Sequence, residues 1–448
     1  TFEDIMNIIE FEKPDGVLVQ FGGQTPLKIA EQLTKEGVKI FGTSSASIDL
    51  AENREEFARI IKKLKIQIPE YCIAKNYDEM INFSEVAQFP VLVRPSYVLG
   101  GRAMQIVYNK EQLVDYVFRS AEATNDHPIL IDQFIENAFE FDVDALCDGK
   151  EVFIAGIMQH IEEAGVHSGD SSCVIPPYDM SDKIKKNIID MTTKLALELN
   201  VIGLINLQFA VKGNEVYVLE VNPRSSRTVP FVSKYSNVPL ANIAAQLSVG
   251  KKLKDFNLEE NNFNHIAVKK AVLPFKKFKN EKIFLGPEMK STGEVMGIDS
   301  EPGVAFLKAM QSDGYTVPNE GTAFVSISDI DKKRALPIIR DLTKLNFTII
   351  ATKGTADFFT ENGIECTSIF KVGEGRPNVV DEILNDNIHL VINTPLGAQS
   401  RYDEEAIGKT SVMKNILTIT TLAGAKAAIA AMSHLDQVSV KPLQEYFK

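Results

Sequence analysis

Strand-like and helix-like segments follow two different orders along the 448 residues, and this contrast limits the folds open to the chain. From residue 321 onward, short apolar segments alternate regularly with amphipathic ones. Between residues 128 and 221, strand-like segments mostly follow one another directly. Regular alternation predicts a parallel sheet covered by helices, whereas consecutive strands predict antiparallel sheets. We therefore expect a multidomain protein that combines α/β and α+β parts.

The same pattern divides the chain into four segments. Residues 1–45 read as strand–helix–strand, which predicts a parallel pair and only the C-terminal part of an α/β domain. Residues 46–254 form the α+β domain, and the polar residues 255–320, with recurring glycine and proline, form a connecting region. Residues 321–448 form a doubly wound parallel-sheet domain. Because the chain opens at Thr1 inside a helix-like stretch, we expect it to be a piece of a longer protein.

Local signals predict three details of this fold. One helix is expected over residues 51–64, and another begins with Pro26 at its first position. Residues 202–211 and 215–221 predict two strands of a hairpin, because a turn with glycine at position 213 joins them.

Composition excludes several classes of function. Acidic residues number 60 and basic residues 48, so the net charge of −12 argues against a nucleic-acid or membrane-surface partner. No apolar run is long enough to span a membrane, and no secretory signal opens the chain. The four cysteines have neither metal-knuckle nor redox-pair spacing, which indicates a reducing compartment and a cytoplasmic location.

Polar side chains gather on and after the predicted hairpin. Gln208 and Glu220 lie on its two strands, and Asn222 follows. Carboxylate and amide oxygens suit Mg²⁺ or Mn²⁺. Arg224 and Arg227 come next, and guanidinium groups match phosphate or carboxylate oxygens. The group suits phosphoryl transfer; a strand end with ordinary surface charges is the alternative.

A second group lies before a glycine pair. Arg94 ends a strand ahead of Gly100 and Gly101, which would let backbone N–H groups approach a phosphate. The segment is not a Walker loop, and a plain hairpin turn is the alternative. Spacing alone places Asp132 and Glu140 at the surface.

Residues 160–171 place two histidines and three carboxylates in one polar loop. An oxygen-rich loop suits K⁺, Mg²⁺ or a nucleotide better than zinc, and a solvated loop is the alternative. In the C-terminal domain, Thr352 and Thr355 join a strand to a helix and could cradle a phosphate. Helix capping by these threonines is the simpler reading.

Five runs together resemble the large chain of carbamoyl phosphate synthetase, specifically its C-terminal half. They occupy residues 19–26, 91–104, 164–171, 208–211 with 220–224, and 285–296. The resemblance covers essentially the whole chain. It implies part of a pre-ATP-grasp α/β unit, an ATP-grasp synthetase domain and a methylglyoxal-synthase-like regulatory domain.

The resemblance also implies an activity. Carbamate and MgATP would give carbamoyl phosphate and MgADP, for pyrimidine and arginine biosynthesis. The enzyme would be an ATP-dependent ligase of the glutamine-hydrolysing or ammonia type. Its partners would be a first synthetase half and a glutaminase small chain, neither encoded here, and the regulatory domain could support a homo-oligomer.

Site residues carry over by motif. Gln208 and Glu220 resemble metal ligands supported by Asn222, and Arg224 with Arg227 would hold the carbamate or the transferring phosphoryl group. The remaining ATP contacts would be Arg54, Arg94, Asp132, Ile135, Glu140, Gly165, Val166, His167 and Ser168. The loop expected to coordinate K⁺ contributes His160, Glu162, Val166 and Ser171.

The regulatory domain would bind a phosphorylated regulator, for which the family offers uridine nucleotides, IMP and phosphoribosyl pyrophosphate. The residues that resemble this site are Lys332, Thr352, Thr355, Lys371, Asn393 and Thr394. Two departures argue against activation by ornithine, although the carboxylates Glu162 and Asp170 are retained. Lys270 stands where ornithine-activated members carry a carboxylate, and residues 417–422 lack their tyrosine.

Three other readings stay open. Another ATP-grasp ligase would share the metal and nucleotide residues but would lack the block from residue 321 onward. A catalytically incomplete regulatory fragment fits the expectation that residues 1–45 form only the C-terminal part of their domain. Methylglyoxal synthase activity in the last domain is disfavoured, because no histidine stands beside Asp403 and Glu404.

Overall fold

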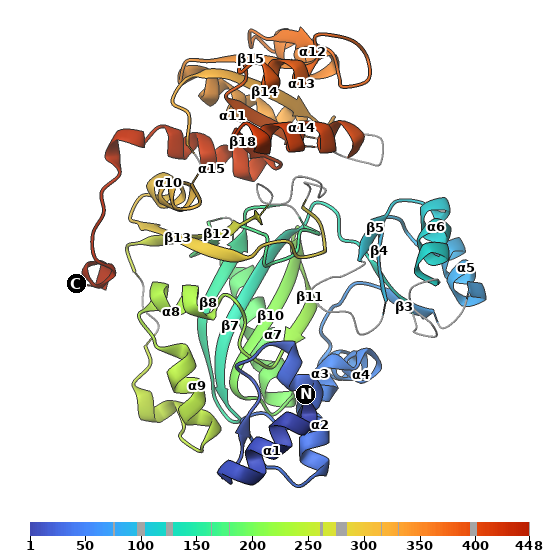
Figure 1. The fold of residues 1–448 in the computed structure, drawn as a ribbon, viewed down its shortest axis with the longest axis vertical. Helices are drawn as coiled ribbons and strands as arrows, with labels where there is room; N and C mark the ends of the chain where they lie inside the picture. Colours follow the sequence, from blue (N-terminus) through green and yellow to red (C-terminus); the bar gives the residue numbers. More distant parts are fainter. Residues whose placement is uncertain are drawn as a thin grey trace.

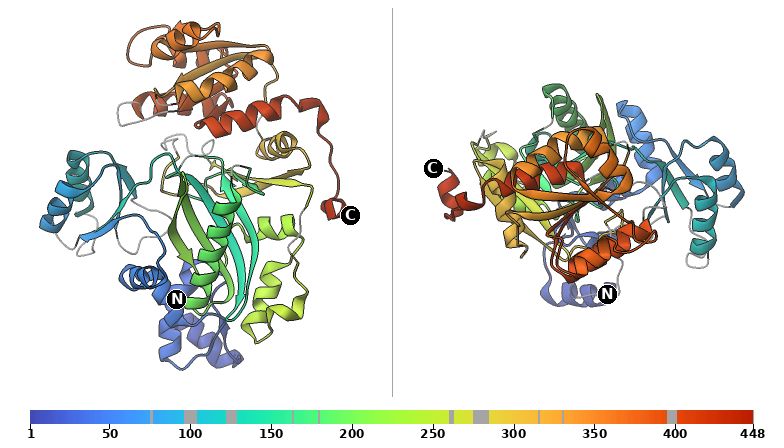
Figure 2. Two further views of the ribbon diagram at one scale, coloured as in Figure 1. Left: turned by 180° about the vertical axis from the view of Figure 1, so that it is seen from behind. Right: turned by 90° about the horizontal axis from the view of Figure 1, so that it is seen from above.

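Three bodies surround a tall central sheet in the computed structural model (Figure 1). The described residues are 1–74, 77–95, 104–121, 129–162, 164–178, 180–259, 263–274, 285–314, 316–329, 331–394 and 401–447. The N-terminal unit lies at the lower end of the sheet, a four-stranded sheet lies to one side, and the C-terminal domain lies above (Figures 1 and 2). The molecule is therefore built from several domains.

The N-terminal unit has the predicted strand–helix–strand order. Its elements are α1 (Phe2–Glu12), β1 (Val17–Leu18), α2 (Gln24–Lys35), β2 (Ile40–Phe41) and α3 (Ser45–Glu52). The expected parallel pair is confirmed, with β1 hydrogen-bonded to β2. The position of Pro26 was wrong, because α2 begins at Gln24 with Gly23 as its N-cap. Pro26 still lies in the first turn, where a missing N–H costs no helix hydrogen bond.

The single helix expected over 51–64 is instead two helices that meet at Asn53. Asn53 ends α3 and caps α4 (Arg54–Leu64) in an extended conformation. Its Oδ1 accepts hydrogen bonds from the backbone N–H groups of Glu55 (3.1 Å) and Glu56 (3.2 Å). Side-chain competition with the backbone explains this break, since asparagine favours caps over helix interiors.

The four-stranded sheet is antiparallel, with the order β3-β6-β4-β5. Its strands are β3 (Tyr71–Ala74), β4 (Val91–Pro95), β5 (Gln105–Val107) and β6 (Ile129–Gln133), and its helices are α5 (Tyr77–Val86) and α6 (Lys110–Ala121). Val93, Val107 and Ile131 form its fully buried core. Such a small separate core makes this sheet a distinct body.

The central sheet has seven antiparallel strands in the order β11-β10-β7-β8-β9-β12-β13. The first five in sequence are β7 (Phe139–Asp148), β8 (Val152–His160), β9 (Cys173–Ile175), β10 (Ile202–Lys212) and β11 (Glu215–Asn222). On one face, Val143, Ala145 and Cys147 pack with the residues of α7 (Asp182–Glu198). On the other, Leu146 packs with α8 (Val229–Ser236) and α9 (Leu240–Ser248). The predicted hairpin is confirmed in β10 and β11.

Residues 255–320 do more than connect two domains. They supply β12 (Ile266–Val272), β13 (Gly293–Asp299) and α10 (Pro302–Ser312), after a short 3-10 helix η1 (Leu253–Phe256). Both strands extend the central sheet. The sequence did not predict them because lysines and glycines interrupt their apolar pattern.

The C-terminal domain confirms the doubly wound prediction, with five parallel strands in the order β16-β15-β14-β17-β18. The strands are β14 (Gly321–Ile327), β15 (Phe347–Thr352), β16 (Thr367–Ile369), β17 (Leu390–Thr394) and β18 (Leu417–Ile419). The helices are α11 (Lys332–Lys344), α12 (Lys353–Glu361), α13 (Val379–Leu384), α14 (Arg401–Met413) and α15 (Leu422–Met432).

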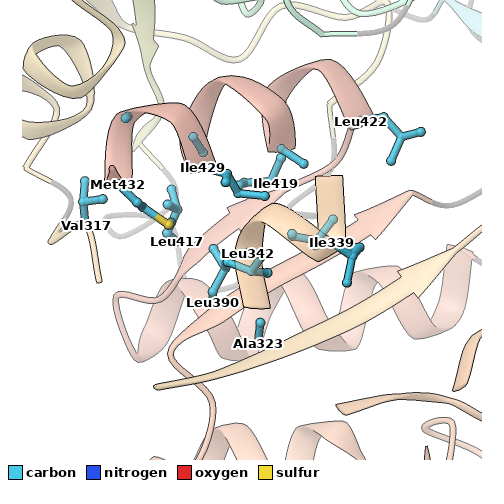
Figure 3. Close-up of a cluster of buried hydrophobic side chains, with 14 of the residues drawn as sticks. Val317, Ala323, Ile339, Leu342, Leu390, Leu417, Ile419, Leu422, Ile429 and Met432 are labelled. Carbon is cyan, nitrogen blue, oxygen red and sulfur yellow. The ribbon is translucent and has the colours of Figure 1, made fainter. Parts of the chain in front are cut away.

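The core of this domain continues into the interface with the central sheet. Figure 3 shows Leu422, Ile429 and Met432 of α15 beside Ile339 and Leu342 of α11. The other side of α15 contacts α10, which lies on β12 and β13. The end of the chain returns to the same region, where the Tyr446 hydroxyl donates to the carbonyl of Ile298 at 2.8 Å. The two domains therefore share one packed boundary.

Gly297→Ala should destabilise this boundary. A Cβ at Gly297 would lie 1.9 Å from the carbonyl oxygen of Ala305 and 2.6 Å from the nitrogen of Ala309, so the backbone of α10 must move. We expect the free energy of unfolding to fall by about 1–3 kcal/mol, which would appear as a lower urea midpoint. Gly293→Ala on the same strand is the control, because its Cβ would meet nothing within 4 Å. Equal midpoints for the two variants would contradict the packing described.

Candidate active site

One cavity of about 880 Å³ lies between the central sheet, the four-stranded sheet and the N-terminal unit. Every residue assigned by motif to ATP, metal or catalysis lines it. These are Arg54, Arg94, Asp132, Ile135, Glu140, Gly165, Val166, His167, Ser168, Gln208, Glu220, Asn222, Arg224 and Arg227. The cavity is large enough for a nucleotide-sized ligand.

Gln208 and Glu220 are direct partners across the hairpin, with a bulge immediately after Gln208. The Gln208 amide donates from Nε2 to Ser168 Oγ at 2.7 Å, so its oxygen Oε1 is available to a cation. The described part of the chain contains no cluster of three or more His, Cys, Asp or Glu residues that could hold a metal ion. A cation here would depend on one carboxylate with amide oxygens, a donor set that suits Mg²⁺ when phosphate completes its shell.

The two arginines lie on the loop that follows β11. Arg224 donates to Asn222 Oδ1 (3.1 Å) and, through Nε, to Gln24 Oε1 (3.0 Å). Arg227 donates to Ser291 Oγ at 3.4 Å. Gln20 also holds this loop, since its Nε2 donates to the carbonyl of Pro223 at 2.7 Å. The run over residues 19–26 therefore contributes two glutamines to the site, which motif spacing alone did not reveal.

Asp132 is buried, so its placement at the surface was wrong. Its side chain lies between two guanidinium groups, with Arg54 hydrogen-bonded to Oδ1 and Arg94 3.4 Å from Oδ2. Arg54 comes from the first turn of α4, whereas Arg94 and Asp132 lie on adjacent strands β4 and β6. The carboxylate therefore orients two arginines at the cavity wall.

The loop over residues 165–171 is held from several sides. Gly165 donates to Glu140 Oε1 at 3.0 Å and has φ +93°, and a Cβ there would lie 2.8 Å from the Phe134 ring. Burial lowers the pKa of His167, although Asp170 and other carboxylates oppose this effect. The neutral ring accepts a hydrogen bond from the Gly169 N–H at 3.0 Å. The loop is thus preorganised beside the cavity.

Only Val166 of the four residues expected to coordinate K⁺ lines this cavity. His160 is buried behind it, with Nε2 3.2 Å from Asp142 Oδ2 and Nδ1 3.3 Å from Glu140 Oε2. Burial opposes the charge of His160, but Cys173 and Asp142 raise its pKa above the ordinary value. Ser171 Oγ is buried without a hydrogen-bond partner in the described structure.

Glu162 faces a different cavity, of about 130 Å³, between the central sheet and the C-terminal domain. It accepts hydrogen bonds from the backbone and hydroxyl of Ser172. Lys270 lines the same cavity and pairs with Asp313 at 2.7 Å. Asp170 accepts backbone hydrogen bonds from Lys290 and Ser291, at 2.8 Å each.

Two charged residues of the site escaped the sequence analysis. Lys269 is 1 % exposed, lines the large cavity and donates to the carbonyl of Ser168 at 3.1 Å. Asp144 is fully buried beneath the arginine loop, and burial raises its pKa to about 6 against the opposing effect of Thr228, Ser226 and Asn206. A charge inside an apolar strand pattern was the available signal for both.

In the C-terminal domain, the expected regulator residues gather at the carboxyl ends of the strands. Thr394 Oγ1 accepts from the Ser328 N–H (3.2 Å), and Thr355 Oγ1 accepts from the Ile327 N–H (3.3 Å). Thr352 is the N-cap of α12 but makes no side-chain cap hydrogen bond, so the capping reading was wrong for it. Asn393 lies beside Thr394 on β17.

Two lysines converge outside these strand ends. Lys332 donates to the carbonyl of Gly354 and pairs with Asp329, both at 2.7 Å. The pKa of Asp329 is lowered mainly by Lys332 and also by Lys371. The strand order changes direction between β14 and β17, the usual ligand position in such sheets.

The glycine pair Gly100-Gly101, expected to approach a phosphate, lies outside the described residues.

About two-thirds of the chain shares its fold with biotin carboxylases. The biotin carboxylase domain of 2-oxoglutarate carboxylase from Hydrogenobacter thermophilus matches with a TM-score of 0.57 and 16% identity, over 69% of this chain and 77% of that one. A biotin carboxylase from Campylobacter jejuni gives 0.56 and 14%, over 69% and 78%. With the parallel-sheet C-terminal domain, the structure combines a biotin carboxylase-like fold with an added α/β domain.

Sequence comparison identifies the family. The Carbamoyl-phosphate synthase L chain, ATP binding domain matches residues 53–256, the Carbamoyl phosphate synthase preATP-grasp domain residues 1–50, and the MGS-like domain residues 334–420. The "Carbamoyl phosphate synthase large chain, C-terminal section" of Aquifex aeolicus is 48% identical over 100% of this chain and 88% of its own length. The chain belongs to the carbamoyl phosphate synthase large chain family.

The chain spans less than half the length of other relatives. The large chain of Archaeoglobus fulgidus is 53% identical over 100% of this chain but only 42% of its own length, and that of Methanobrevibacter smithii is 51% identical over the same shares. In the described part of the chain, no helix is long and apolar enough to cross a membrane.

Asp132→Asn should loosen the contact between α4 and the four-stranded sheet. The change leaves two largely buried guanidinium groups without their shared carboxylate. We expect the free energy of unfolding to fall by about 1–3 kcal/mol, measured by urea denaturation. Asp190→Asn is the control, because its pair with Lys194 is solvent-exposed and worth at most about 0.5 kcal/mol. A loss no larger than in the control would show that Asp132 does not hold these arginines.

Proposed function

We propose that this chain performs the carbamate-phosphorylating step of carbamoyl phosphate synthesis and acts as an ATP-dependent ligase within a larger synthetase. The observation that carries the proposal is the cavity that joins the cross-strand pair Gln208 and Glu220 to two pairs of arginines. Arg54 and Arg94 lie on one wall, and Arg224 and Arg227 on the other. Such a site could neutralise a triphosphate and an anionic acceptor together.

In this step, a carbamate oxygen attacks the γ-phosphorus of ATP. A new P–O bond forms as the bond from γ-phosphorus to the β,γ-bridging oxygen breaks, and ADP leaves with that oxygen and the electron pair. No side-chain nucleophile is required, so the protein positions the reactants and stabilises charge. Arg224 and Arg227 would hold the carbamate or the transferring phosphoryl group, and Arg54 and Arg94 the nucleotide phosphates.

The remaining nucleotide contacts would come from the preorganised loop at residues 165–168, with Asp132, Ile135 and Glu140. Gln208 and Glu220 would hold Mg²⁺ or Mn²⁺, and Asn222 would support them. The free Oε1 of Gln208 fits this role, because Ser168 already takes its amide group. When bound, the metal neutralises charge on the phosphate oxygens. The biotin carboxylase domain from Hydrogenobacter thermophilus was crystallised with MgADP, and its shared fold supports this assignment.

A K⁺ ion would bind behind the nucleotide loop, near His160, Glu162, Val166 and Ser171. The unpartnered Ser171 Oγ supports this placement, since a buried hydroxyl without a partner is costly unless a ligand satisfies it. The C-terminal domain would take a phosphorylated regulator at the strand ends that carry Thr352, Thr355, Asn393 and Thr394. Lys332 and Lys371 would supply positive charge there.

The partners would be the first synthetase half and a glutaminase small chain, which would deliver carbamate made from bicarbonate and ammonia. The product would serve pyrimidine and arginine biosynthesis in the cytoplasm. The name of the Archaeoglobus relative and its greater length support a place within a larger enzyme.

Glu220→Gln should abolish the reverse reaction, in which carbamoyl phosphate and MgADP give ATP. We expect the rate to fall by at least about a hundredfold, since the variant removes the carboxylate proposed to bind the cation. Luciferase detection of ATP would measure it. Glu215→Gln is the matched control, because Glu215 is exposed on the same strand and does not line the cavity. Retained activity in Glu220→Gln, or a folded chain that binds no MgADP, would contradict the proposal.

Ser171→Ala should weaken the binding of K⁺. We expect the K⁺ concentration for half-maximal rate to rise about threefold to tenfold, since one oxygen ligand is lost. Ser411→Ala is the control, because it also removes a buried, unpartnered hydroxyl, but from the C-terminal domain. An unchanged K⁺ dependence in Ser171→Ala would place the ion elsewhere.

A further inference from the structure

Asp144 is a fully buried carboxylate on β7, in the middle of the central sheet. It accepts three hydrogen bonds from neutral donors. Asn206 Nδ2 and Ser226 Oγ donate to Oδ1 at 3.0 and 2.7 Å, and Thr228 Oγ1 donates to Oδ2 at 2.5 Å. Asn206 comes from the adjacent strand β10, but Ser226 and Thr228 come from the arginine loop.

The two hydroxyl donors flank Arg227 in sequence and follow Arg224 closely. Ser226 Oγ and Thr228 Oγ1 lie 2.8 Å from each other, so the loop brings two hydroxyl donors together on one carboxylate. Both donors line the large cavity, whereas Asp144 lies one layer below it. The carboxylate therefore contacts the cavity lining through these two hydroxyls and through Asn206 of β10.

A buried carboxylate requires donors, and here the loop supplies most of them. No salt bridge to Asp144 is found in the described part of the chain, so its charge depends on these hydroxyls and on Asn206. Hydrogen bonds to an ionised group are about twice as strong as neutral ones. Moving the loop would strip the carboxylate of its donors, and this cost ties the loop to one conformation.

We propose that Asp144 is a positioning residue, whose buried carboxylate holds the loop that carries Arg224 and Arg227 through the hydroxyls of Ser226 and Thr228. Gln20 and Gln24 hold the same loop from the N-terminal unit, so it is fixed from two sides. This inference rests on the proposed function for the role of the arginines. The attachment of the loop can be tested without any activity.

Hydrogen–deuterium exchange of residues 224–228 tests the attachment directly. In Asp144→Asn and Thr228→Val we expect exchange about tenfold faster than in the wild type, because charge-assisted hydrogen bonds are lost. Thr228→Ser keeps the hydroxyl and should exchange as the wild type does. Thr192→Val is the matched control, because it removes a buried, unpartnered hydroxyl from α7 on the opposite face of the sheet. Unchanged exchange in both Asp144→Asn and Thr228→Val would overturn the proposal.

Kinetics of the reverse reaction test the consequence. Asp144→Asn should lower kcat about tenfold to a hundredfold, as expected when a reacting group is misplaced, and should leave the KM for MgADP within about twofold. A residue that only supported the fold would change both parameters or neither. A wild-type chain without activity would count against the proposed function alone, since the exchange measurement would still decide the role of Asp144.

Discussion

The site depends on the register of one antiparallel hairpin. Gln208 lies directly opposite Glu220, and Asn206 opposite Asn222, so that four polar side chains come from two neighbouring strands. A slip of one residue would turn these groups toward the opposite face, where Phe209 and Val221 are now buried. The apolar residues between the polar ones therefore determine where these polar groups lie, and the bulge after Gln208 adjusts their position locally.

Buried charge organises the rest of the cavity. Asp132 orients two arginines, Lys269 supports the loop at residues 165–171, and Asp144 holds the arginine loop from beneath. Each of these groups is costly to bury alone and is satisfied only in the observed arrangement. The N-terminal unit also helps to fix the cavity wall, because Gln20 and Gln24 hydrogen-bond the loop after β11. The expected reactants are anionic, and donors fixed in advance need little rearrangement to receive them.

Pattern and resemblance together predicted much of this arrangement. Alternation and turn chemistry predicted the parallel C-terminal domain and the β10–β11 hairpin, because both signals are local. The break at Asn53 and the strands β12 and β13 were not predicted, since side-chain competition and long-range sheet pairing override local propensity. The cavity residues were named by motif, but the burial of Asp132 and the roles of Asp144 and Lys269 were not. These features depend on which side chains meet across distant segments, and spacing along one chain does not encode that directly.

A crystal structure of the chain with ADP and Mg²⁺ tests the central claim most directly. The account predicts one metal ion bound by Gln208 Oε1 and the Glu220 carboxylate, with the nucleotide phosphates facing Arg54 and Arg94. The adenosine would lie along the loop at residues 165–168. A nucleotide bound outside this cavity, or a metal held without Gln208 and Glu220, would contradict it.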